Sequence, residues 1–313
     1  MVKIYFTEDG VVKKITEPQV GCWVSLINPS EKEVTDIAEQ YNIDADSLRA
    51  ALDEEERSRI EVEDNYTMVL VNMPTYDTND KEETYYTIPL SVFLAKDAII
   101  TVCLEDTPVL DAFANGRIKD FYTHMKTRFI LQLLYRNSSL FLYYLRLIDK
   151  KSEQVENELQ SSTKNHELIE LLKLEKSLVY FTTALRSNEV VLEKLLRNEN
   201  VKKYPEDTDL LEDVIVENKQ AIEMASIYSG ILSGMMDAFA SVISNNLNIV
   251  MKFLAVVTIV MSIPTMIFSA YGMNVALEGM PFASSPYGFL IVISLALVLS
   301  LIVAFIFARK KRL

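Results

Sequence analysis

The chain has few of the side chains that usually carry nucleophilic or metal chemistry, with two cysteines and two histidines in 313 residues. Cys22 and Cys103 lie far apart in apolar runs, which argues against a disulfide framework or a zinc site and predicts buried, reduced thiols. His124 and His166 stand in charged, helical surroundings and are not expected to bind metal. Because the sequence also lacks a nucleophile–base set, a glycine-rich phosphate loop and a cluster of metal ligands, we expect neither an enzyme nor a resident cofactor.

Basic residues are under-represented too, with 31 Lys and Arg against 44 Asp and Glu and a net charge of −13. Residues 1–250 carry 26 basic and 43 acidic side chains, whereas residues 251–313 carry five basic and one acidic. An acidic body repels nucleic-acid phosphates and attracts cations, so no nucleic-acid partner is expected. The first residues contain no apolar core of a signal peptide, so a cleaved signal is not expected either.

Long uncharged runs occur near the carboxyl end. There are 25 residues without a charge between Lys252 and Glu278, and 30 between Glu278 and Arg309. About 20 apolar residues in a helix cross the hydrocarbon core of a bilayer, which is about 30 Å thick. The pattern therefore predicts a membrane hairpin with the spans Phe253–Tyr271 and Tyr287–Ala308.

The distribution of basic residues predicts the orientation of this hairpin. Lys252 precedes the first span and Arg309–Arg312 follow the second, while the link between the spans has no basic residue. By the positive-inside rule, both termini lie in the cytoplasm and the link faces outward. We expect a multi-pass protein of the cell (inner) membrane, with the lipid bilayer as one partner.

Strand and helix signals alternate before residue 107, which predicts an α+β cytoplasmic domain. Ser30 and Glu33 fit a capping box that opens a helix ending near Tyr41, and a second helix is expected over Asp46–Glu55. Expected strands are Val2–Thr7, Val11–Thr16, Trp23–Ile27, Arg59–Met73, Thr84–Leu94 and Ala98–Leu104, the first two joined by a turn at Glu8-Asp9-Gly10.

Helical periodicity dominates the rest of the chain. Long helices are expected over His124–Leu159, His166–Arg197 and Thr208–Ser269, the last running into the first span without a break. The predicted organisation is an α+β domain (1–107), a helical arm (108–207), a stalk helix continuing into the first span (208–271), an external loop (272–286), a second span (287–308) and a basic cytoplasmic tail (309–313).

The stalk helix carries two sets of residues that repeat every seven positions. They are Leu211, Asn218, Ala225, Leu232, Phe239, Asn246 and Phe253, and Val214, Ala221, Tyr228, Met235, Val242 and Ile249. A sustained heptad favours packing around an axis with other copies, although packing against the chain's own helices would give the same pattern.

A second face of this helix is polar where the surroundings are apolar. Its residues, here called the polar stripe, advance by steps of four and three: Asp237, Ser241, Ser244, Asn248, Met251, Ala255, Thr258, Ser262, Thr265 and Ser269. Within the span the stripe consists of Thr258, Ser262, Thr265 and Ser269 and suggests the uncharged wall of a pore, although Ser and Thr that bond their own helix or a neighbouring one would explain it too. Two spans cannot enclose a pore, so several copies would be needed. A neutral lining suits an ion that keeps its water shell, such as Mg²⁺.

The first span ends in Tyr271-Gly272-Met273-Asn274, and a short loop and a second span follow. A Gly-Met-Asn tripeptide in this place, with Asn248-Ile-Val-Met251-Lys252 before the span and Met280-Pro281 in the loop, closely resembles the CorA family of divalent metal-ion transporters. The resemblance covers the whole layout of the chain. It implies a funnel-shaped homopentamer that passes Mg²⁺ into the cytoplasm, driven by the membrane potential.

The resemblance also implies roles for single residues. Asn274, with carbonyls near Gly272 in the motif Tyr271–Asn274, would accept hydrogen bonds from the water shell of Mg²⁺ at the outer mouth. Glu278 would concentrate cations there. Met251 and Leu254 are implied to form an apolar gate. Asp237 and Asn248 are implied to line the polar mouth of the pore on the cytoplasmic side.

One departure from the family concerns sensing of cytoplasmic Mg²⁺. Asp213 matches the acidic stalk position of relatives that use Mg²⁺ as a regulatory ion, but their Glu-Asp partner is replaced by Leu48-Arg49-Ala50-Ala51. Arg49 would repel Mg²⁺ unless Asp46, Asp53 or Glu54 compensates. We therefore expect weaker or relocated feedback.

Two other functions remain open from the sequence. One is a zinc transporter of the same superfamily, disfavoured because the stripe has no His, Cys or carboxylate within the membrane. The other is a membrane-anchored helical scaffold without transport. Whether Co²⁺ or Ni²⁺ passes with Mg²⁺ stays open as well.

Overall fold

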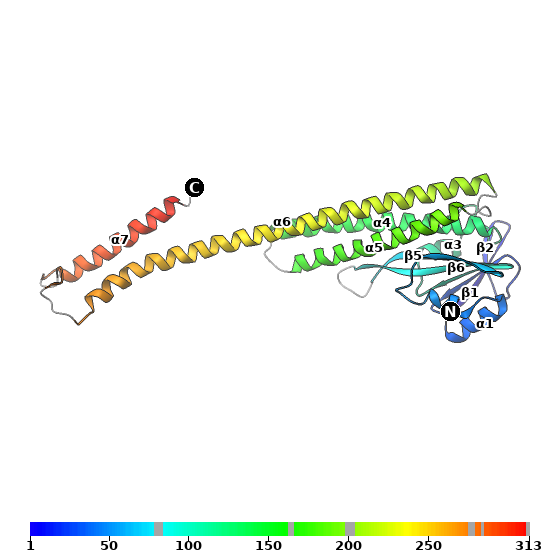
Figure 1. The fold of residues 1–313 in the computed structure, drawn as a ribbon, viewed down its shortest axis with the longest axis horizontal. Coiled ribbons are helices and arrows are strands. Elements are labelled where there is room, and N and C mark those ends of the chain that lie inside the picture. The colour runs from blue at the N-terminus through cyan, green and yellow to red at the C-terminus, as the bar shows by residue number, and fades with distance from the viewer. Residues whose placement is uncertain (78–83, 162–165, 198–203, 275–278, 283–284, 311–313) are drawn as a thin grey trace. The chain divides into compact units, whose positions relative to one another are not determined.

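The structure, a computed structural model, describes residues 1–77, 84–161, 166–197, 204–274, 279–282 and 285–310 (Figure 1). The chain divides into two compact units, Met1–Met236 and Asp237–Leu313. Glu278, predicted at the outer mouth, lies outside the described residues, as do the last three residues of the basic tail.

Among its described residues, the first unit opens with a seven-stranded sheet in the order β2-β1-β3-β7-β6-β5-β4. The pair β3 and β7 is parallel and the other neighbouring pairs are antiparallel. Positive φ angles at Asp9 and Gly10 form the predicted turn between β1 and β2. The strands are β1 (Val2–Glu8), β2 (Val11–Ile15), β3 (Cys22–Ile27), β4 (Arg59–Val62), β5 (Tyr66–Tyr76), β6 (Tyr85–Ala95) and β7 (Ala98–Cys103).

Two of the predicted elements differ from the structure. The run Arg59–Met73 is not one strand, because Asp64 and Asn65 favour a turn and the backbone reverses there, with Glu63 N donating to Tyr66 O over 2.9 Å. The helix expected over Asp46–Glu55 is also too long. It ends at Ala50, shortly before the acidic run of residues 53–56, where the Asp53 carboxylate accepts from Glu55 N in a local turn.

The short helices are α1 (Glu31–Tyr41), α2 (Ala45–Ala50) and α3 (Pro108–Ala114). The predicted capping box is present: Ser30 Oγ accepts from Glu33 N, and the Glu33 carboxylate accepts from Ser30 N at 2.8 Å. Apolar residues of α1 and α2 pack on one face of the sheet around Val24, Leu70 and Phe93.

The other face of the sheet packs on α3 and on three long helices, α4 (Lys126–Ser161), α5 (His166–Arg197) and α6 (Pro205–Tyr271). Figure 1 shows these three helices side by side above the sheet. Trp23 is fully buried among aromatic rings on this face, and its Nε1 donates to Thr101 Oγ1 over 2.9 Å. Cys22 and Cys103 are buried free thiols, as predicted.

The heptad of α6 is used in two ways. Its buried members in the first unit are Leu211, Val214, Asn218, Ala221, Ala225 and Leu232. They pack within the chain, where Asn218 Nδ2 donates to Leu185 O over 3.2 Å. From Leu211 to Leu232, the interpretation that the heptad packs against the chain's own helices is therefore confirmed. Beyond Leu232, Met235 and Phe239 are half-buried, and the repeat is exposed from Val242 onward, at Val242, Ile249 and Phe253.

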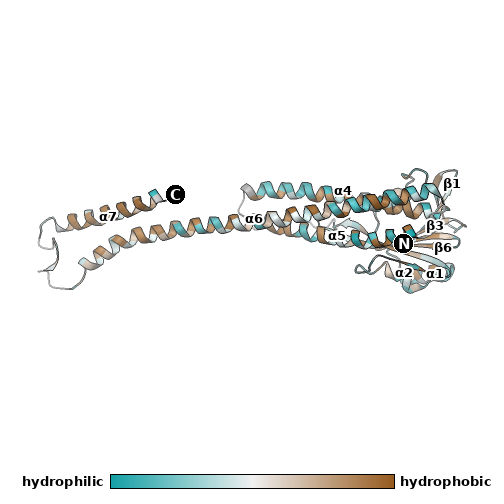
Figure 2. Cartoon of the chain, turned by 45° about the horizontal axis from the view of Figure 1, so that its top comes forward, coloured by the Kyte–Doolittle hydropathy of each residue, from teal (hydrophilic) through white to brown (hydrophobic). Residues whose placement is uncertain are grey.

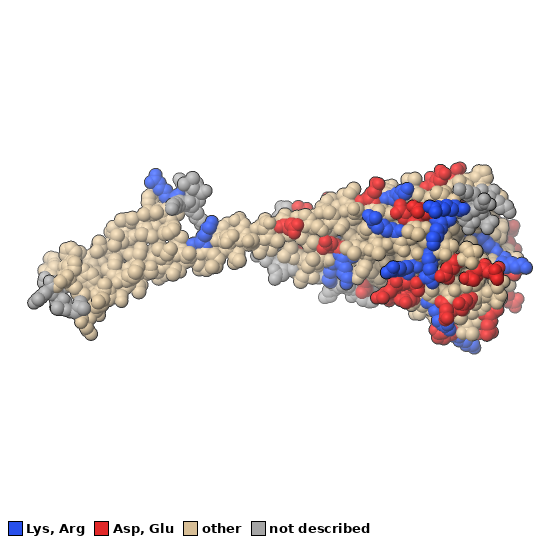
Figure 3. Space-filling model, in the orientation of Figure 1, with Lys and Arg blue, Asp and Glu red and all other residues tan. Residues whose placement is uncertain are grey.

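The second unit contains the remainder of α6 and α7 (Gly288–Lys310). Both helices are long and apolar enough to cross a membrane. Figure 2 shows α7 as hydrophobic along nearly its whole length, and Figure 3 shows charged side chains covering the first unit and few on the second. Pro264 lies inside α6 without ending the helix, so the predicted continuous helix is confirmed.

Candidate ion pathway

The polar stripe of α6 lies on the surface of the single chain. All ten of its residues fall within one unbroken helix, and nine are exposed, Ser262 being half-buried. Asp237, Asn248, Thr258, Thr265 and Ser269 therefore present polar groups along one face.

Three hydroxyl groups of the stripe within the span donate to backbone carbonyls of their own helix, which is one of the two explanations of the pattern. Thr258 Oγ1 donates to Leu254 O over 2.8 Å, and Thr265 Oγ1 donates to Met261 O over 3.0 Å. Ser262 Oγ donates to Ile259 O over 2.8 Å. Each hydroxyl proton is thus used, but the lone pairs of the oxygen remain available to accept hydrogen bonds from outside the helix.

By the same spacing, the exposed face continues toward the start of α6. Its residues, here called the upper stripe, are Asp213, Val216, Gln220, Glu223, Ile227, Gly230 and Gly234, and all are exposed. They lie opposite the buried heptad residues Leu211, Asn218 and Ala225. One side of α6 thus packs on the chain's own helices, while the other is free over its length.

The predicted gate residues lie on the exposed surface of α6. Met251 is 57% exposed and Leu254 51% exposed. An apolar constriction at this level thus needs the same residues from other copies.

At its carboxyl end, α6 is followed directly by the Gly-Met-Asn tripeptide, residues 272–274. The helix ends at Tyr271, and Gly272 N completes its last turn by donating to Phe268 O over 2.9 Å. Gly272, Met273 and Asn274 are exposed. Tyr271 is half-buried, and its hydroxyl donates to Pro281 O over 2.8 Å.

The residues considered for Mg²⁺ sensing lie in two places in the first unit. Asp213 is exposed on α6. Arg49 is neutralised within the chain, with Nη1 2.6 Å from Asp46 Oδ1 and Nη2 3.1 Å from Glu31 Oε2. Asp46 is therefore already paired. Among the described residues, no group of three or more His, Cys, Asp or Glu side chains is placed to hold a metal ion.

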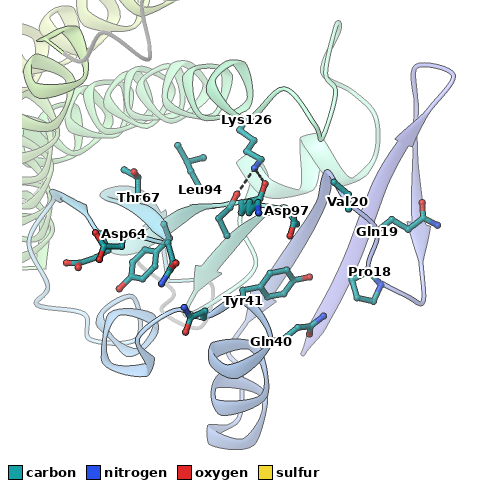
Figure 4. Close-up of a pocket in the computed structure, with 16 residues that line it drawn as sticks. Pro18, Gln19, Val20, Gln40, Tyr41, Asp64, Thr67, Leu94, Asp97 and Lys126 are labelled. Carbon is teal, nitrogen blue, oxygen red and sulfur yellow. Dashed lines mark hydrogen bonds between the residues drawn. The ribbon is translucent and has the colours of Figure 1, made fainter.

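A cavity of 760 Å³ in the first unit was not predicted from the sequence. Lys126, the first residue of α4, reaches across one end and donates to Ala95 O and Lys96 O (Figure 4). Partial burial lowers the pKa of this ammonium group. Because it caps the turn between β6 and β7, the lysine has a structural role here. No sequence pattern indicated it, since the contact joins residues about 30 positions apart.

Comparison with known proteins identifies the family. The sequence matches, over residues 18–311, the family described as CorA-like Mg2+ transporter protein. The chain belongs to the CorA family. The Cobalt/magnesium transport protein CorA of Methanocaldococcus jannaschii is 27% identical over 300 residues, covering 92% of this chain and 90% of the relative. The CorA protein of Thermotoga maritima is 24% identical over 294 residues, with 92% and 82% covered.

Solved structures agree on the fold. The complete structure of the CorA magnesium transporter from Methanocaldococcus jannaschii matches with a TM-score of 0.83 at 23% identity, covering 99% of this chain and 98% of that one. The cytoplasmic domain of ZntB from Vibrio parahaemolyticus matches more distantly, with a TM-score of 0.56 at 12% identity over 79% of this chain and 97% of that one. The predicted resemblance to CorA is thus confirmed.

Proposed function

We propose that the chain assembles as a homopentamer and passes Mg²⁺ into the cytoplasm through a pore lined by the polar stripe of α6. The observation that carries this proposal is the exposed face of α6, which stays polar through an otherwise apolar span. Membership of the CorA family supports the ion class, and a relative's name includes cobalt besides magnesium. The number of copies rests on the resemblance to the family.

The hydrogen bonds of the stripe suit a hydrated cation. Water molecules bound to Mg²⁺ direct their hydrogen atoms outward, so the water shell presents hydrogen-bond donors. Mg²⁺ loses this shell reluctantly. The hydroxyl groups of Thr258, Ser262 and Thr265 donate hydrogen bonds to carbonyls of their own helix, so their oxygen lone pairs remain available as acceptors. A wall of acceptors without fixed charge can guide such an ion without binding it strongly.

The proposed direction follows from the charge pattern. Lys252 and the basic residues from Arg309 onward place both termini in the cytoplasm by the positive-inside rule. Asn274 then faces outward, where its side-chain amide oxygen would meet the arriving hydrated ion. Moving two charges through 100 mV releases about 4.6 kcal/mol, so the membrane potential is a sufficient driving force.

Uptake of Mg²⁺ into proteoliposomes tests this function. The wild-type protein should accumulate Mg²⁺ under an inside-negative potential, and Asn274→Ala should lower the initial rate at least tenfold. Asn157→Ala, at an exposed asparagine of α4, is the matched control and should leave the rate unchanged. Equal rates for wild type and Asn274→Ala would remove the proposed role of Asn274, and a protein without uptake would be a scaffold.

Zinc transport is tested in the same vesicles. Within the span the polar stripe holds no His, Cys or carboxylate to bind Zn²⁺, so Mg²⁺ flux should exceed Zn²⁺ flux at equal concentration. The reverse order would favour the zinc alternative.

Feedback by cytoplasmic Mg²⁺ is proposed to be weak or relocated in this protein. Asp213 is exposed and could contribute to a site between copies, but Arg49 is already paired with Asp46 and Glu31. Asp213→Ala should therefore reduce inhibition by internal Mg²⁺ only partly. Complete loss of inhibition in flux assays would contradict this.

A further inference from the structure

Tyr271, the last residue of α6, lies on the opposite side of the helix from the polar stripe. It follows Ser269 by two positions, and at about 100° per residue these positions are about 200° apart around the helix axis. Tyr271 is half-buried, whereas Ser269 is exposed. Although Tyr271 belongs to the mouth motif, its ring therefore faces away from the proposed pathway.

The hydroxyl of Tyr271 joins two parts of the outer mouth. It donates to the carbonyl oxygen of Pro281 over 2.8 Å, which ties the end of α6 to the segment that leads back to α7. A cavity of 470 Å³ lies between the end of α6, this segment and the start of α7, lined by Phe268, Tyr271, Phe282 and Phe289 among others. Because side-chain packing is incomplete there, a directed hydrogen bond contributes more to the position of the segment.

The same segment is held from the α7 side by a glycine. A Cβ added at Gly288 would overlap the carbonyl oxygen of Phe282. Phe282 itself has a φ of +65°, a conformation that large side chains rarely adopt. Pro281 and Phe282 are thus constrained from both helices, by a hydrogen bond at Tyr271 and by close backbone approach at Gly288.

We infer that Tyr271 is a positioning residue of the outer mouth. Its hydroxyl holds Pro281 against the end of α6 and thereby sets the direction in which Met273 and Asn274 leave the helix, without contacting the ion. This inference rests on the proposed function, since only there does the orientation of the Asn274 amide affect transport.

Tyr271→Phe tests the role, because it removes one hydroxyl and keeps the ring. The probes are Mg²⁺ uptake and calorimetric binding of hexaamminecobalt(III), whose ammine donors mimic a Mg²⁺ water shell but do not exchange. The KM for Mg²⁺ and the Kd for the cobalt complex should rise about three- to tenfold, the range of one hydrogen bond. The maximal rate should stay within about twofold of wild type. Gly288→Ala should shift both constants in the same direction.

Two matched controls separate this role from general effects. Tyr287→Phe alters a tyrosine that is 68% exposed, and Gly279→Ala adds a Cβ that meets nothing within 4 Å. Both should keep the wild-type constants. Equal constants for Tyr271→Phe and Tyr287→Phe would overturn the inference, as would a loss of maximal rate without a change in KM. If the wild-type protein took up no Mg²⁺, the proposed function would fail instead, whatever Tyr271→Phe does to binding of the cobalt complex.

Discussion

At the scale of single residues, buried amides complete the hydrogen bonding where the sheet ends. β4 begins at Arg59, which pairs with Leu70 of β5. Because β5 continues past Leu70, the backbone of Asn72 lies beyond the part of β5 that pairs with β4. Asn188 of α5 takes the place of a strand there: its Oδ1 accepts from Asn72 N at 2.9 Å, and its Nδ2 donates to Asn72 O at 2.8 Å. The 3.6-residue repeat predicted α5, but it gave no reason for a polar side chain on the buried face.

Replacing this asparagine should destabilise the first unit. Asn188→Leu leaves the buried Asn72 N–H without its acceptor and also removes the acceptor of Ser58 Oγ at 2.8 Å. Unpaired buried groups cost about 1–3 kcal/mol each, so a loss of about 2–4 kcal/mol is expected. Thermal unfolding followed by circular dichroism should show a clearly lower Tm. Asn157→Leu, on the exposed side of α4, should change it little, and equal Tm values would refute the assignment.

At the scale of elements, α6 explains both what was predictable and what was not. Its length followed from the shortage of helix-breaking residues between Thr208 and Ser269, and its polar stripe followed from spacing. The heptad did not reveal its partner, because a repeat of seven reports which face is apolar and not what covers it. The structure separates the two parts, since Leu232 is 1% exposed and Val242 is 52% exposed.

The unburied part of the heptad should hold copies together. Val242→Asp places a charge on a face that is free in the single chain, so the fold should survive while the assembly dissociates. Val242→Leu should leave the assembly intact. Light scattering after size-exclusion chromatography in detergent measures the outcome. An oligomer unaffected by Val242→Asp would show that this part of the heptad faces lipid or water.

At the scale of the whole molecule, the acidic soluble unit, the continuous helix and the apolar second unit form the layout of the CorA family. Composition and uncharged runs were enough to predict this layout because membrane spans have strict length and charge requirements. The packing at the carboxyl end of α6 was less predictable. The hydrogen bond from Tyr271 to Pro281 joins residues ten positions apart, and no helical or strand repeat in the sequence indicates that they meet.

The central claim is that the hydroxyl face of α6 borders water in the assembled protein. Single cysteines at Thr258 and Thr265, and at Val260 and Ile267 about 200° around the helix, test it with a charged, membrane-impermeant thiol reagent. The native thiols should stay silent, because both are buried and burial raises the pKa of Cys103 to about 12. The cysteines at Thr258 and Thr265 should react and lose Mg²⁺ flux, while those at Val260 and Ile267 should not. Reaction only at Val260 and Ile267 would contradict the account.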